Sequence, residues 1–203
     1  ARKLHLVLGQ GLGSRMISLD LPPFTLIAAT TRLNLLSAPL RSRFGAVFQL
    51  DYYTIPEIES IIKRSAQILG VEIDPPATSS IARASRFTPR LANRLLKRAR
   101  DVAEVGGLNL IDEKVIFKTM DLLGVDTLGL EEFDRRFLET IVKKFKNRPV
   151  GVNTLAAALG EEKGVLEEIC EPYLLRLGFL ERTPQGRKAT EAAQKHLKIA
   201  DSH

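Results

Sequence analysis

The stretch "EPYLLRLGFLERTPQGRKAT", residues 171–190, decides how the last third of the chain folds. It begins as the end of an apolar helical pattern and continues as two short strand-like runs around the turn residues "TPQG". Two further helical patterns, residues 131–146 and 153–160, come before it, and a last helical stretch follows it. Three helices followed by a β-hairpin predict a winged helix. The usual partner of a winged helix is duplex DNA, although many bind protein instead.

Two arginines, Arg182 and Arg187, flank the turn and are predicted to face each other across the hairpin. Like charges directly opposite each other are mildly destabilising. The pair is easier to explain if both side chains reach for phosphates, to which Arg is well suited. The alternative is two solvated surface arginines. Lys163 and Lys188 would extend a basic patch at this place.

Residues 54–126 have the pattern of a small all-helical unit. Thr54 with Glu57 three residues later fits a capping box, and Thr88 before Pro89 marks another helix start. Hydrophobic residues recur at helical spacing after these starts. The four predicted helices cover residues 54–70, 77–85, 88–105 and 112–124.

The run "LNLIDEK", residues 108–114, resembles the acidic end of the metal-binding strand of an ATPase. Asn109 interrupts its apolar residues and a helical pattern starts at once, so a helix cap at Asp112 is the better interpretation. The sequence also contains no G-x-x-x-x-G-K-[ST] phosphate loop. It therefore cannot hold a magnesium–nucleotide complex in the usual P-loop manner.

The front of the chain opens with two runs of alternating apolar and polar residues, 3–8 and 15–21. The link "GQGLGS", residues 9–14, contains three glycines. A dinucleotide-binding loop must open a helix, and here a strand pattern follows. A β-hairpin with a Gly-rich turn is therefore favoured over a phosphate cradle.

Two further strands are predicted beyond this hairpin. Residues 24–31, "FTLIAATT", form a continuous apolar run that suits a strand of a parallel sheet buried on both faces. Residues 46–53, "AVFQLDYY", form the second predicted strand. The segment between them, residues 32–45, has room for one or two helical turns near Pro39.

Four residues of the chain are candidates for binding a nucleotide, three for its phosphates and one for its base. Arg41 and Arg43 follow the short Pro-containing segment, where an α/β sheet presents its ligand edge. Arg90 falls in the first turn of a helix, where the helix dipole is unfavourable for a cation and does not stabilise it. Tyr53 stands between the sheet part and the helical part, a natural place to cover a flat ring. Together they suggest a nucleotide held mainly by residues upstream of Ala1, whereas solvated surface charge is the alternative for the arginines.

The composition is that of an ordinary globular protein, with 203 residues, 44% of them hydrophobic, and a net charge of +6. This length allows one large domain or two to three small ones. Residues 1–52 carry most of the surplus, with 6 Lys and Arg against 2 Asp and Glu. Cys170 is the only cysteine, so the chain has no internal disulfide and no Cys-based metal site, which fits a reducing cytosol. No apolar run approaches the roughly 18–20 residues of a membrane span, and without an initial Met we expect a fragment.

Several stretches resemble the RuvB family, the hexameric AAA+ motors of Holliday-junction branch migration. The resemblance implies an α/β plus all-α architecture: residues 1–53 as the C-terminal part of a large AAA+ ATPase subdomain with its β-hairpin, residues 54–126 as a small helical (lid) subdomain, and residues 127–203 as a winged-helix DNA-binding head. The stretches that carry it occur in order along essentially the whole chain: "PPFTLIAATTR", "APLRSRFG", "TPRLANRLLKRARD", "GLEEFDRR", "PVGVNTLAAALGEE" and "EPYLLRLGFLERTPQGR".

The resemblance implies roles at a nucleotide site for four residues. Arg43 matches the arginine finger, which acts in trans on the ATP of the neighbouring subunit. Thr31 matches the first sensor, which reads the γ-phosphate. Arg90 matches the second sensor, and Tyr53 matches a position in the nucleotide pocket. ATP and Mg²⁺, held mainly by residues upstream of this chain, are the implied cofactors.

The resemblance also implies partners. Arg182 and Arg187 match DNA-contacting positions of the wing, and the opening hairpin matches the one that docks on RuvA. A homo-hexamer acting on duplex DNA at Holliday junctions, in the cytoplasm and without a membrane, is the assembly expected from the family.

The sequence departs from the family at three places as well as in the absent phosphate loop. One is "NRPVG", residues 147–151, which replaces a more usual Gly-Gly before Pro149. Phe87 stands where the family usually has Gly, so the loop that leads to Arg90 is shifted if that Gly needs a positive φ. Gln185 stands where the family often has Arg, which removes one cation from the wing. We predict that the chain does not hydrolyse ATP alone. A non-catalytic winged-helix DNA-binding protein is the alternative function, and a subunit that only completes a neighbour's ATP site is a third.

Overall fold

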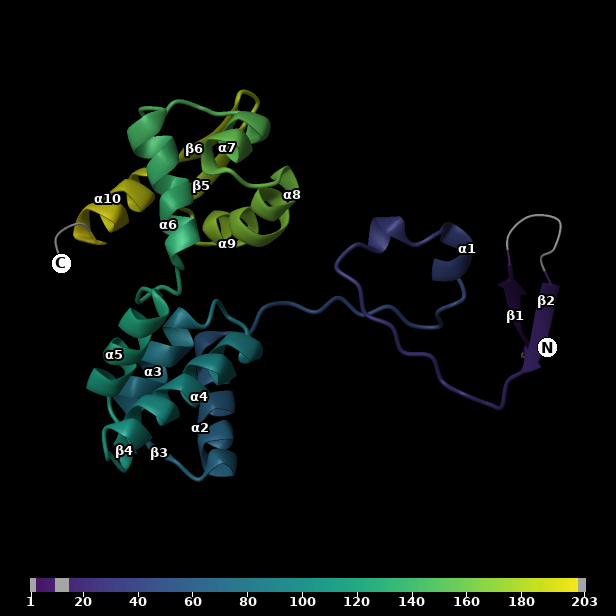
Figure 1. The fold of residues 1–203 in the computed structure, drawn as a ribbon, viewed down its shortest axis with the longest axis horizontal. Helices are drawn as coiled ribbons and strands as arrows, with labels where there is room; N and C mark the ends of the chain where they lie inside the picture. Colours follow the sequence, from purple (N-terminus) through teal and green to yellow (C-terminus); the bar gives the residue numbers. More distant parts are fainter. Residues whose placement is uncertain (1–2, 10–14, 201–203) are drawn as a thin grey trace. The chain divides into compact units, whose positions relative to one another are not determined.

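A computed structural model of the chain describes residues 3–9 and 15–200 (Figure 1). The chain divides into two compact units, Ala1–Leu50 and Asp51–His203. The second unit contains two hydrophobic cores, one among the helices that precede residue 126 and one in the part that follows. No helix among the described residues is both long and apolar enough to cross a membrane.

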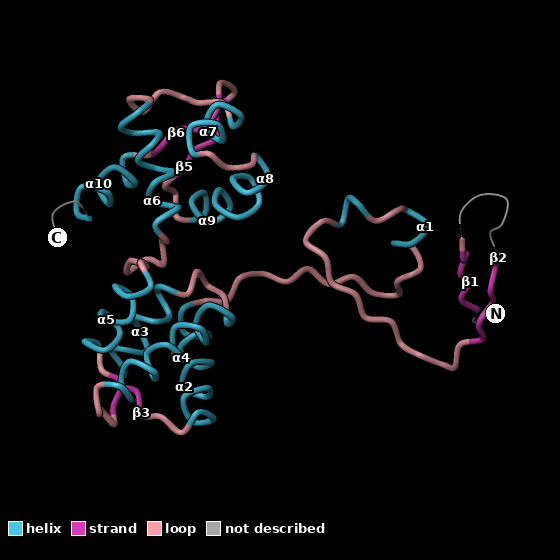
Figure 2. The backbone as a smooth tube through the Cα atoms, viewed as in Figure 1, coloured by secondary structure: helices cyan, strands magenta, loops and turns pink. Residues whose placement is uncertain are grey.

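The first unit begins with the predicted hairpin, which the structure confirms. Strand β1 (Lys3–Leu8) pairs antiparallel with β2 (Arg15–Asp20) (Figure 2). In this pairing Leu6 lies opposite Ile17. The apolar side chains that are described in these strands are exposed: Leu4, Leu6, Leu8, Met16, Ile17 and Leu19. Most of the Gly-rich link, residues 10–14, lies outside the described residues.

The prediction of two further strands after the hairpin is wrong. Residues 24–31 and 46–53 have no regular secondary structure and belong to no sheet, and Ile27 is 89% exposed. A strand needs a neighbour that takes up its backbone N–H and C=O groups. Among the described residues of this unit only β1 and β2 pair, so these segments have no such neighbour.

The helical turns predicted between these two segments are present. A short 3₁₀ helix, η2 (Leu33–Leu35), is followed by the one-turn helix α1 (Ala38–Arg41). Pro39 lies in the first turn of α1, where its missing N–H costs nothing. Residues 32–45 therefore behave as the sequence predicts.

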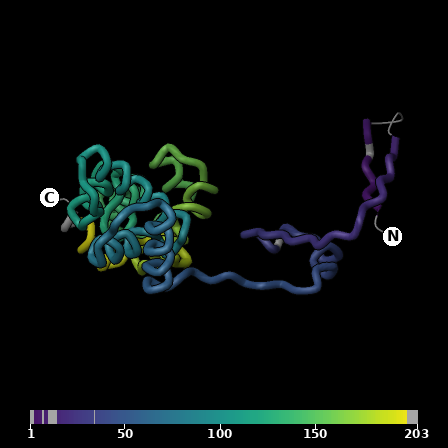
Figure 3. The backbone as a smooth tube through the Cα atoms, turned by 90° about the horizontal axis from the view of Figure 1, so that it is seen from below, coloured from purple at the N-terminus to yellow at the C-terminus, as the bar shows by residue number. Residues whose placement is uncertain are grey.

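The four predicted helices of the middle segment all form and pack side by side (Figure 1; turned by 90° in Figure 3). Two-residue strands β3 (Glu72–Ile73) and β4 (Leu110–Ile111), which were not predicted, pair in parallel at one end. The apolar stripes of the helices meet in a core that includes Ile58, Ile62, Ile81, Leu96 and Ile116. The helices are α2 (Ile55–Leu69), α3 (Pro75–Ala84), α4 (Pro89–Val105) and α5 (Glu113–Leu123).

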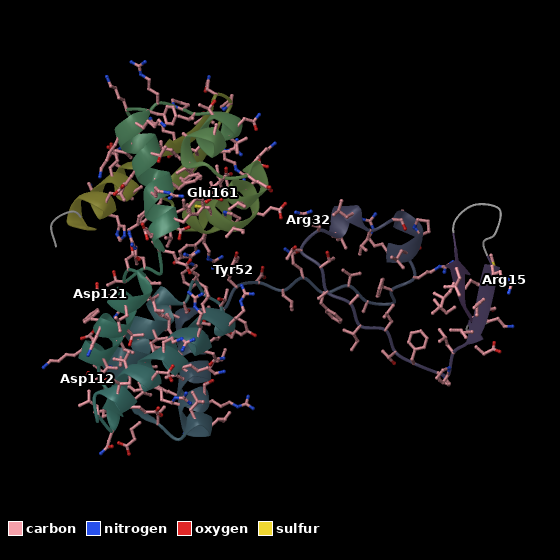
Figure 4. All side chains as sticks on the ribbon, in the orientation of Figure 1. Arg15, Arg32, Tyr52, Asp112, Asp121 and Glu161 are labelled. Carbon is pink, nitrogen blue, oxygen red and sulfur yellow. The ribbon has the colours of Figure 1, made fainter. Side chains whose placement is uncertain are left out.

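Helix starts in this segment are fixed by the predicted caps. Glu57 Oε2 accepts hydrogen bonds from the backbone N–H of Thr54 at 2.7 Å and from its hydroxyl at 2.8 Å. Asp112, labelled in Figure 4, accepts one from the N–H of Val115 at 2.9 Å. Each bond satisfies an N–H or hydroxyl at a helix end. The interpretation of Asp112 as a cap, and not as the end of an ATPase strand, is confirmed.

The last segment is the predicted winged helix. Its helices surround a second core that includes Phe137, Leu155, Leu166 and Leu174. Two short π-helical segments, η3 and η4, continue or connect these helices. The elements are α6 (Glu132–Glu139), η3 (Thr140–Lys144), α7 (Val152–Leu159), α8 (Lys163–Val165), η4 (Leu166–Cys170), α9 (Glu171–Arg176), β5 (Leu180–Thr183), β6 (Gly186–Ala189) and α10 (Glu191–Ala200).

The wing is the β5–β6 hairpin, and Val150 forms a single antiparallel β-bridge with it. The N–H and C=O of Val150 both hydrogen-bond the backbone of Arg187, at 2.9 and 2.7 Å. Gly186 has φ +137°, and a Cβ there would lie 2.3 Å from the carbonyl carbon of Val150. Only glycine fits this position.

Candidate functional site

Arg182 and Arg187 lie directly opposite each other in the wing, as predicted. Both guanidinium groups reach one carboxylate, that of Glu171 at the start of α9. Arg182 Nε and Nη2 donate to Glu171 Oε2 at 2.9 and 2.6 Å, and Arg187 Nε donates to Oε1 at 2.8 Å. The two cations therefore have an internal counterion. This counterion accounts for the like-charge pair without a phosphate, and contact with DNA stays a prediction.

The two wing arginines differ in exposure. The Arg182 side chain is 53% exposed, whereas that of Arg187 is 15% exposed and also bonds Glu167 at 3.0 Å. Burial alone would lower the pKa of Arg187, but the hydrogen bonds and charges of Glu171 and Glu167 outweigh it and raise the pKa. Lys163 Nζ lies 3.7 Å from Glu167. Arg182 is thus the wing arginine with most of its side chain open to a ligand.

Tyr53 and the start of α4, which carries Arg90, are brought together by the backbone. The N–H of Tyr53 donates a hydrogen bond to the carbonyl of Phe87 at 3.3 Å. Phe87 lies just before α4, and Arg90 is exposed in the first turn of that helix. The Tyr53 side chain is 44% exposed. Two of the four predicted nucleotide residues therefore lie on neighbouring, exposed segments.

The turn that leads into α4 has a left-handed backbone at two consecutive residues, Arg86 (φ 51°) and Phe87 (φ 58°). Positive φ is unfavourable for residues other than glycine. The position where the family usually has Gly therefore does take a positive φ in this chain, with Phe in place. Strained backbone of this kind persists only where surrounding contacts hold it.

Arg86 ties this turn to the winged helix. Its Nε donates to the carbonyl of Gly129 at 2.7 Å, and its Nη2 lies 2.5 Å from Asp134 Oδ2. Both side chains of the ion pair are largely buried. The same guanidinium lies 4.9 Å from the centre of the Tyr173 ring, whose pKa burial raises to about 12.

Thr31 and Arg43 lie in the first unit, and both are exposed. Arg43 follows α1, and its backbone N–H donates to the carbonyl of Leu40 at 3.1 Å. Within residues 3–9 and 15–200, no side chain or carbonyl hydrogen-bonds or pairs with the Arg43 guanidinium. The backbone N–H next to Thr31, that of Arg32, is bonded to the Thr30 hydroxyl.

Metal ligands for a nucleotide are not apparent in the described part of the chain, where no group of three His, Cys, Asp or Glu side chains could hold an ion. Binding of a nucleotide by the exposed Arg90 and Tyr53 stays a prediction, and the described residues supply no such cluster for Mg²⁺. Cys170 is buried and unsuited to catalysis. Burial first, and then the charge and hydrogen bond of Asp134, raise the pKa of its thiol well above the ordinary value.

Sequence profiles of three domains match the chain one after another. The "Holliday junction DNA helicase RuvB P-loop domain" matches residues 1–50, the "RuvB AAA lid domain" residues 53–126, and the "RuvB C-terminal winged helix domain" residues 127–198. The chain belongs to the RuvB family. Its described architecture of helical lid and winged-helix head is that of RuvB.

Curated RuvB proteins align with nearly the whole chain. The Holliday junction branch migration complex subunit RuvB of Koribacter versatilis is 52% identical over 97% of this chain and 55% of its own length. RuvB of Thermotoga maritima is 50% identical over 97% of this chain and 59% of its own length. The chain thus spans somewhat more than half the length of these RuvB relatives.

Solved RuvB structures share the fold. The Thermotoga maritima RuvB Holliday junction branch migration motor matches with a TM-score of 0.76 at 52% identity, covering 81% of this chain and 55% of its own. A point mutant of the same RuvB matches with a TM-score of 0.80 at 53% identity, covering 88% of this chain and 60% of its own.

Three residues of this RuvB chain were missed from the sequence. Glu171 is fully buried under the wing, Asp134 binds Arg86, and Arg176 lies over two aromatic rings. Each acts on a partner at least eleven positions away, so no short-range pattern marks it. A buried Glu beside two arginines could have been suspected only from the like-charge pair itself.

Proposed function

We propose that the chain is part of an ATP-driven DNA translocase subunit that moves Holliday junctions in recombination and repair. The observation that carries this proposal is the ordered match of three RuvB domains, supported by relatives named as branch migration subunits. The proposed assembly is a cytoplasmic homo-hexamer on duplex DNA. ATP with Mg²⁺ is its proposed energy source.

In this proposal Arg43 is an arginine finger that acts on the ATP of a neighbouring subunit. Its exposed guanidinium, with no partner among the described residues, suits a role in trans. A guanidinium near the γ-phosphate stabilises the charge of the transferring phosphoryl group, an effect of about 10³–10⁵ in rate in related NTPases. Thr31 is the proposed first sensor of that phosphate.

Arg90 and Tyr53 are proposed to meet the nucleotide from the lid. The support is their exposure and the bond that joins the Tyr53 backbone to Phe87. An Arg in the first helical turn adds positive charge to the positive end of the helix dipole, so an anion is favoured there. Hydrolysis would then alter the lid, and through it the head.

The wing is proposed to hold the DNA backbone through Arg182, with Arg187 beside it. Arginine contacts to phosphates fix the position of a protein on duplex DNA without reading its sequence. A motor that acts on any sequence needs contacts of this kind. The β1–β2 hairpin, with its exposed Leu4, Leu6 and Ile17, is the proposed docking site for RuvA.

The DNA-binding part is tested by titrating labelled duplexes of two unrelated sequences with the chain at several salt concentrations. Affinity should fall steeply with salt. Arg182→Ala should weaken binding to both duplexes equally and lower the salt slope by about 1. Arg98→Ala, which removes a similarly exposed arginine from the lid, is the matched control. Unchanged affinity in Arg182→Ala would remove the wing from the proposal.

A second candidate, a non-catalytic winged-helix DNA-binding protein, is favoured by the absence of a phosphate-loop motif from this sequence. It predicts the same salt dependence but no response to nucleotide. Adding ATP, or a non-hydrolysable analogue, to the full-length assembly separates the two functions. A change in DNA affinity supports the motor, and identical titrations support the second candidate.

A further inference from the structure

Arg176, at the end of α9 in the head, lies over two aromatic rings that belong to the lid side of the same unit. Its guanidinium carbon is 4.3 Å from the centre of the Tyr52 ring and 4.7 Å from that of the Phe87 ring. Both distances are within the range of a cation–π interaction. We call Arg176, Tyr52 and Phe87 the Arg176 clamp; Tyr52 is labelled in Figure 4.

The two rings of the clamp belong to segments that carry proposed nucleotide residues. Tyr52 precedes Tyr53, and Phe87 lies three residues before Arg90. The hydrogen bond from the Tyr53 N–H to the Phe87 carbonyl joins the two segments directly. A single side chain of the head therefore contacts both segments at the point where they meet.

The backbone at Phe87 gives a reason for the ring to be there. Arg86 and Phe87 are both left-handed, a conformation that glycine would take at less cost. The Arg86 side chain is held by Asp134 and Gly129, whereas the Phe87 ring is held by Arg176 and by the apolar core of the head. Contacts from the head thus offset the strain of the turn that starts α4.

We propose that Arg176 is a positioning residue, which holds Tyr53 and the start of α4 in register and transmits the position of the head to them. The clamp itself is independent of what the chain binds, and its consequence for a nucleotide rests on the proposed function. The ring contacts of Arg176 are with Tyr52 and Phe87, and not with Tyr53 or Arg90. Arg176 therefore acts on Tyr53 and Arg90 through these two neighbouring rings.

The clamp is tested by amide hydrogen exchange on the 203-residue chain. In Arg176→Ala, exchange at the Tyr53 amide should become faster by about tenfold, because two cation–π contacts that oppose local opening are lost. Amides of the wing strands should keep their rates. The matched control is Arg136→Ala, which removes an arginine that lies 5.4 Å from the Phe133 ring within the head.

Two further variants separate the clamp from general loss of stability. Arg176→Lys keeps a cation at this position and should restore part of the protection at Tyr53. In a Phe87→Gly background, Arg176→Ala should have a smaller effect, since one of its two partners is already missing. Equal effects in both backgrounds, or the same acceleration in Arg136→Ala, would overturn the clamp.

Transmission from the head is tested by adding duplex DNA to the same exchange experiment. Binding of DNA should slow exchange at Tyr53 in the unmodified chain and leave it unchanged in Arg176→Ala, with similar DNA affinity in both. A response to DNA that persists in Arg176→Ala would contradict transmission through this residue. This readout needs DNA binding, which rests on the proposed function, but no nucleotide. Failure of ATP-driven translocation would therefore leave the result standing, and failure of the clamp would leave the motor proposal untouched.

Discussion

Arg182 and Arg187 face each other across the wing, and their guanidinium groups share the carboxylate of Glu171. Glu171 has no exposed side-chain surface. A fully buried carboxylate is tolerated only when it is paired and hydrogen-bonded, and these two arginines meet both conditions. Glu171 therefore holds the two guanidinium groups of the wing in place, and they are not two independent flexible side chains.

Removing the shared charge should destabilise the head. In Glu171→Gln the two arginines keep their places opposite each other without a common counterion. We expect the free energy of unfolding to fall by about 3 kcal/mol, as for other buried pairs that lose one partner. Chemical denaturation monitored by circular dichroism measures this change.

Glu162→Gln is the control for that experiment, because Glu162 is an exposed carboxylate of the same head. It should change the stability by no more than about 0.5 kcal/mol. Equal stabilities of Glu171→Gln and Glu162→Gln would show that the shared carboxylate does not hold the wing.

Two ion pairs between the lid and the head should differ strongly in strength. Arg86–Asp134 is buried, with exposed fractions of 14% and 4%, whereas Arg94–Glu131 is half exposed, with 50% and 46%. Arg86→Ala should therefore lower the free energy of unfolding by about 3 kcal/mol or more. Arg94→Ala should cost less than about 1 kcal/mol. Thermal unfolding of the two variants in parallel checks the order, and a reversed order would contradict the burial seen here.

The thiol of Cys170 should be inert in the folded chain. Its pKa is raised by burial and by Asp134, so little thiolate exists at about pH 8, where an unfolded cysteine is partly ionised. Alkylation by iodoacetamide should proceed only as fast as the head unfolds. Labelling that is as rapid in the folded chain as in denaturant would contradict this environment.

The same shift predicts a pH dependence of stability. The folded pKa lies above the unfolded value, so the stabilising contribution is complete below the unfolded pKa and is lost as pH rises above about 8.5. The free energy of unfolding should therefore fall with rising pH more steeply in the unmodified chain than in Cys170→Ala. Parallel slopes for the two proteins would show that Cys170 does not contribute.

Local rules in the sequence were enough for most of the helices. The caps at Thr54 and Asp112, the start of α4 at Pro89 and the β1–β2 hairpin all depend on neighbours within a few residues. The prediction of strands at residues 24–31 and 46–53 was wrong for the opposite reason. Their apolar character favours a sheet, but a strand also requires partner strands, and the described residues provide none for them.

The candidate site divides in the same way. The opposition of Arg182 and Arg187 follows from the length of the turn. The contact of both arginines with the buried Glu171, which lies on α9, could not be predicted from neighbouring residues. Phe87 was noted only as a departure from a usual Gly, and the structure adds that its φ is positive. Its contact with Arg176 depends on how the head packs on the turn, which no sequence period encodes.

The most direct test of the account is the rate of ATP hydrolysis by an assembled ring that carries Arg43→Ala. It can be measured in the full-length protein, or in this chain mixed with an intact RuvB subunit, with Arg98→Ala, at an exposed arginine of the lid, as the control. We predict that Arg43→Ala lowers the rate by about 10³ or more while nucleotide binding stays nearly intact, and that Arg98→Ala has little effect. Hydrolysis that continues at a nearly unchanged rate in Arg43→Ala would contradict it.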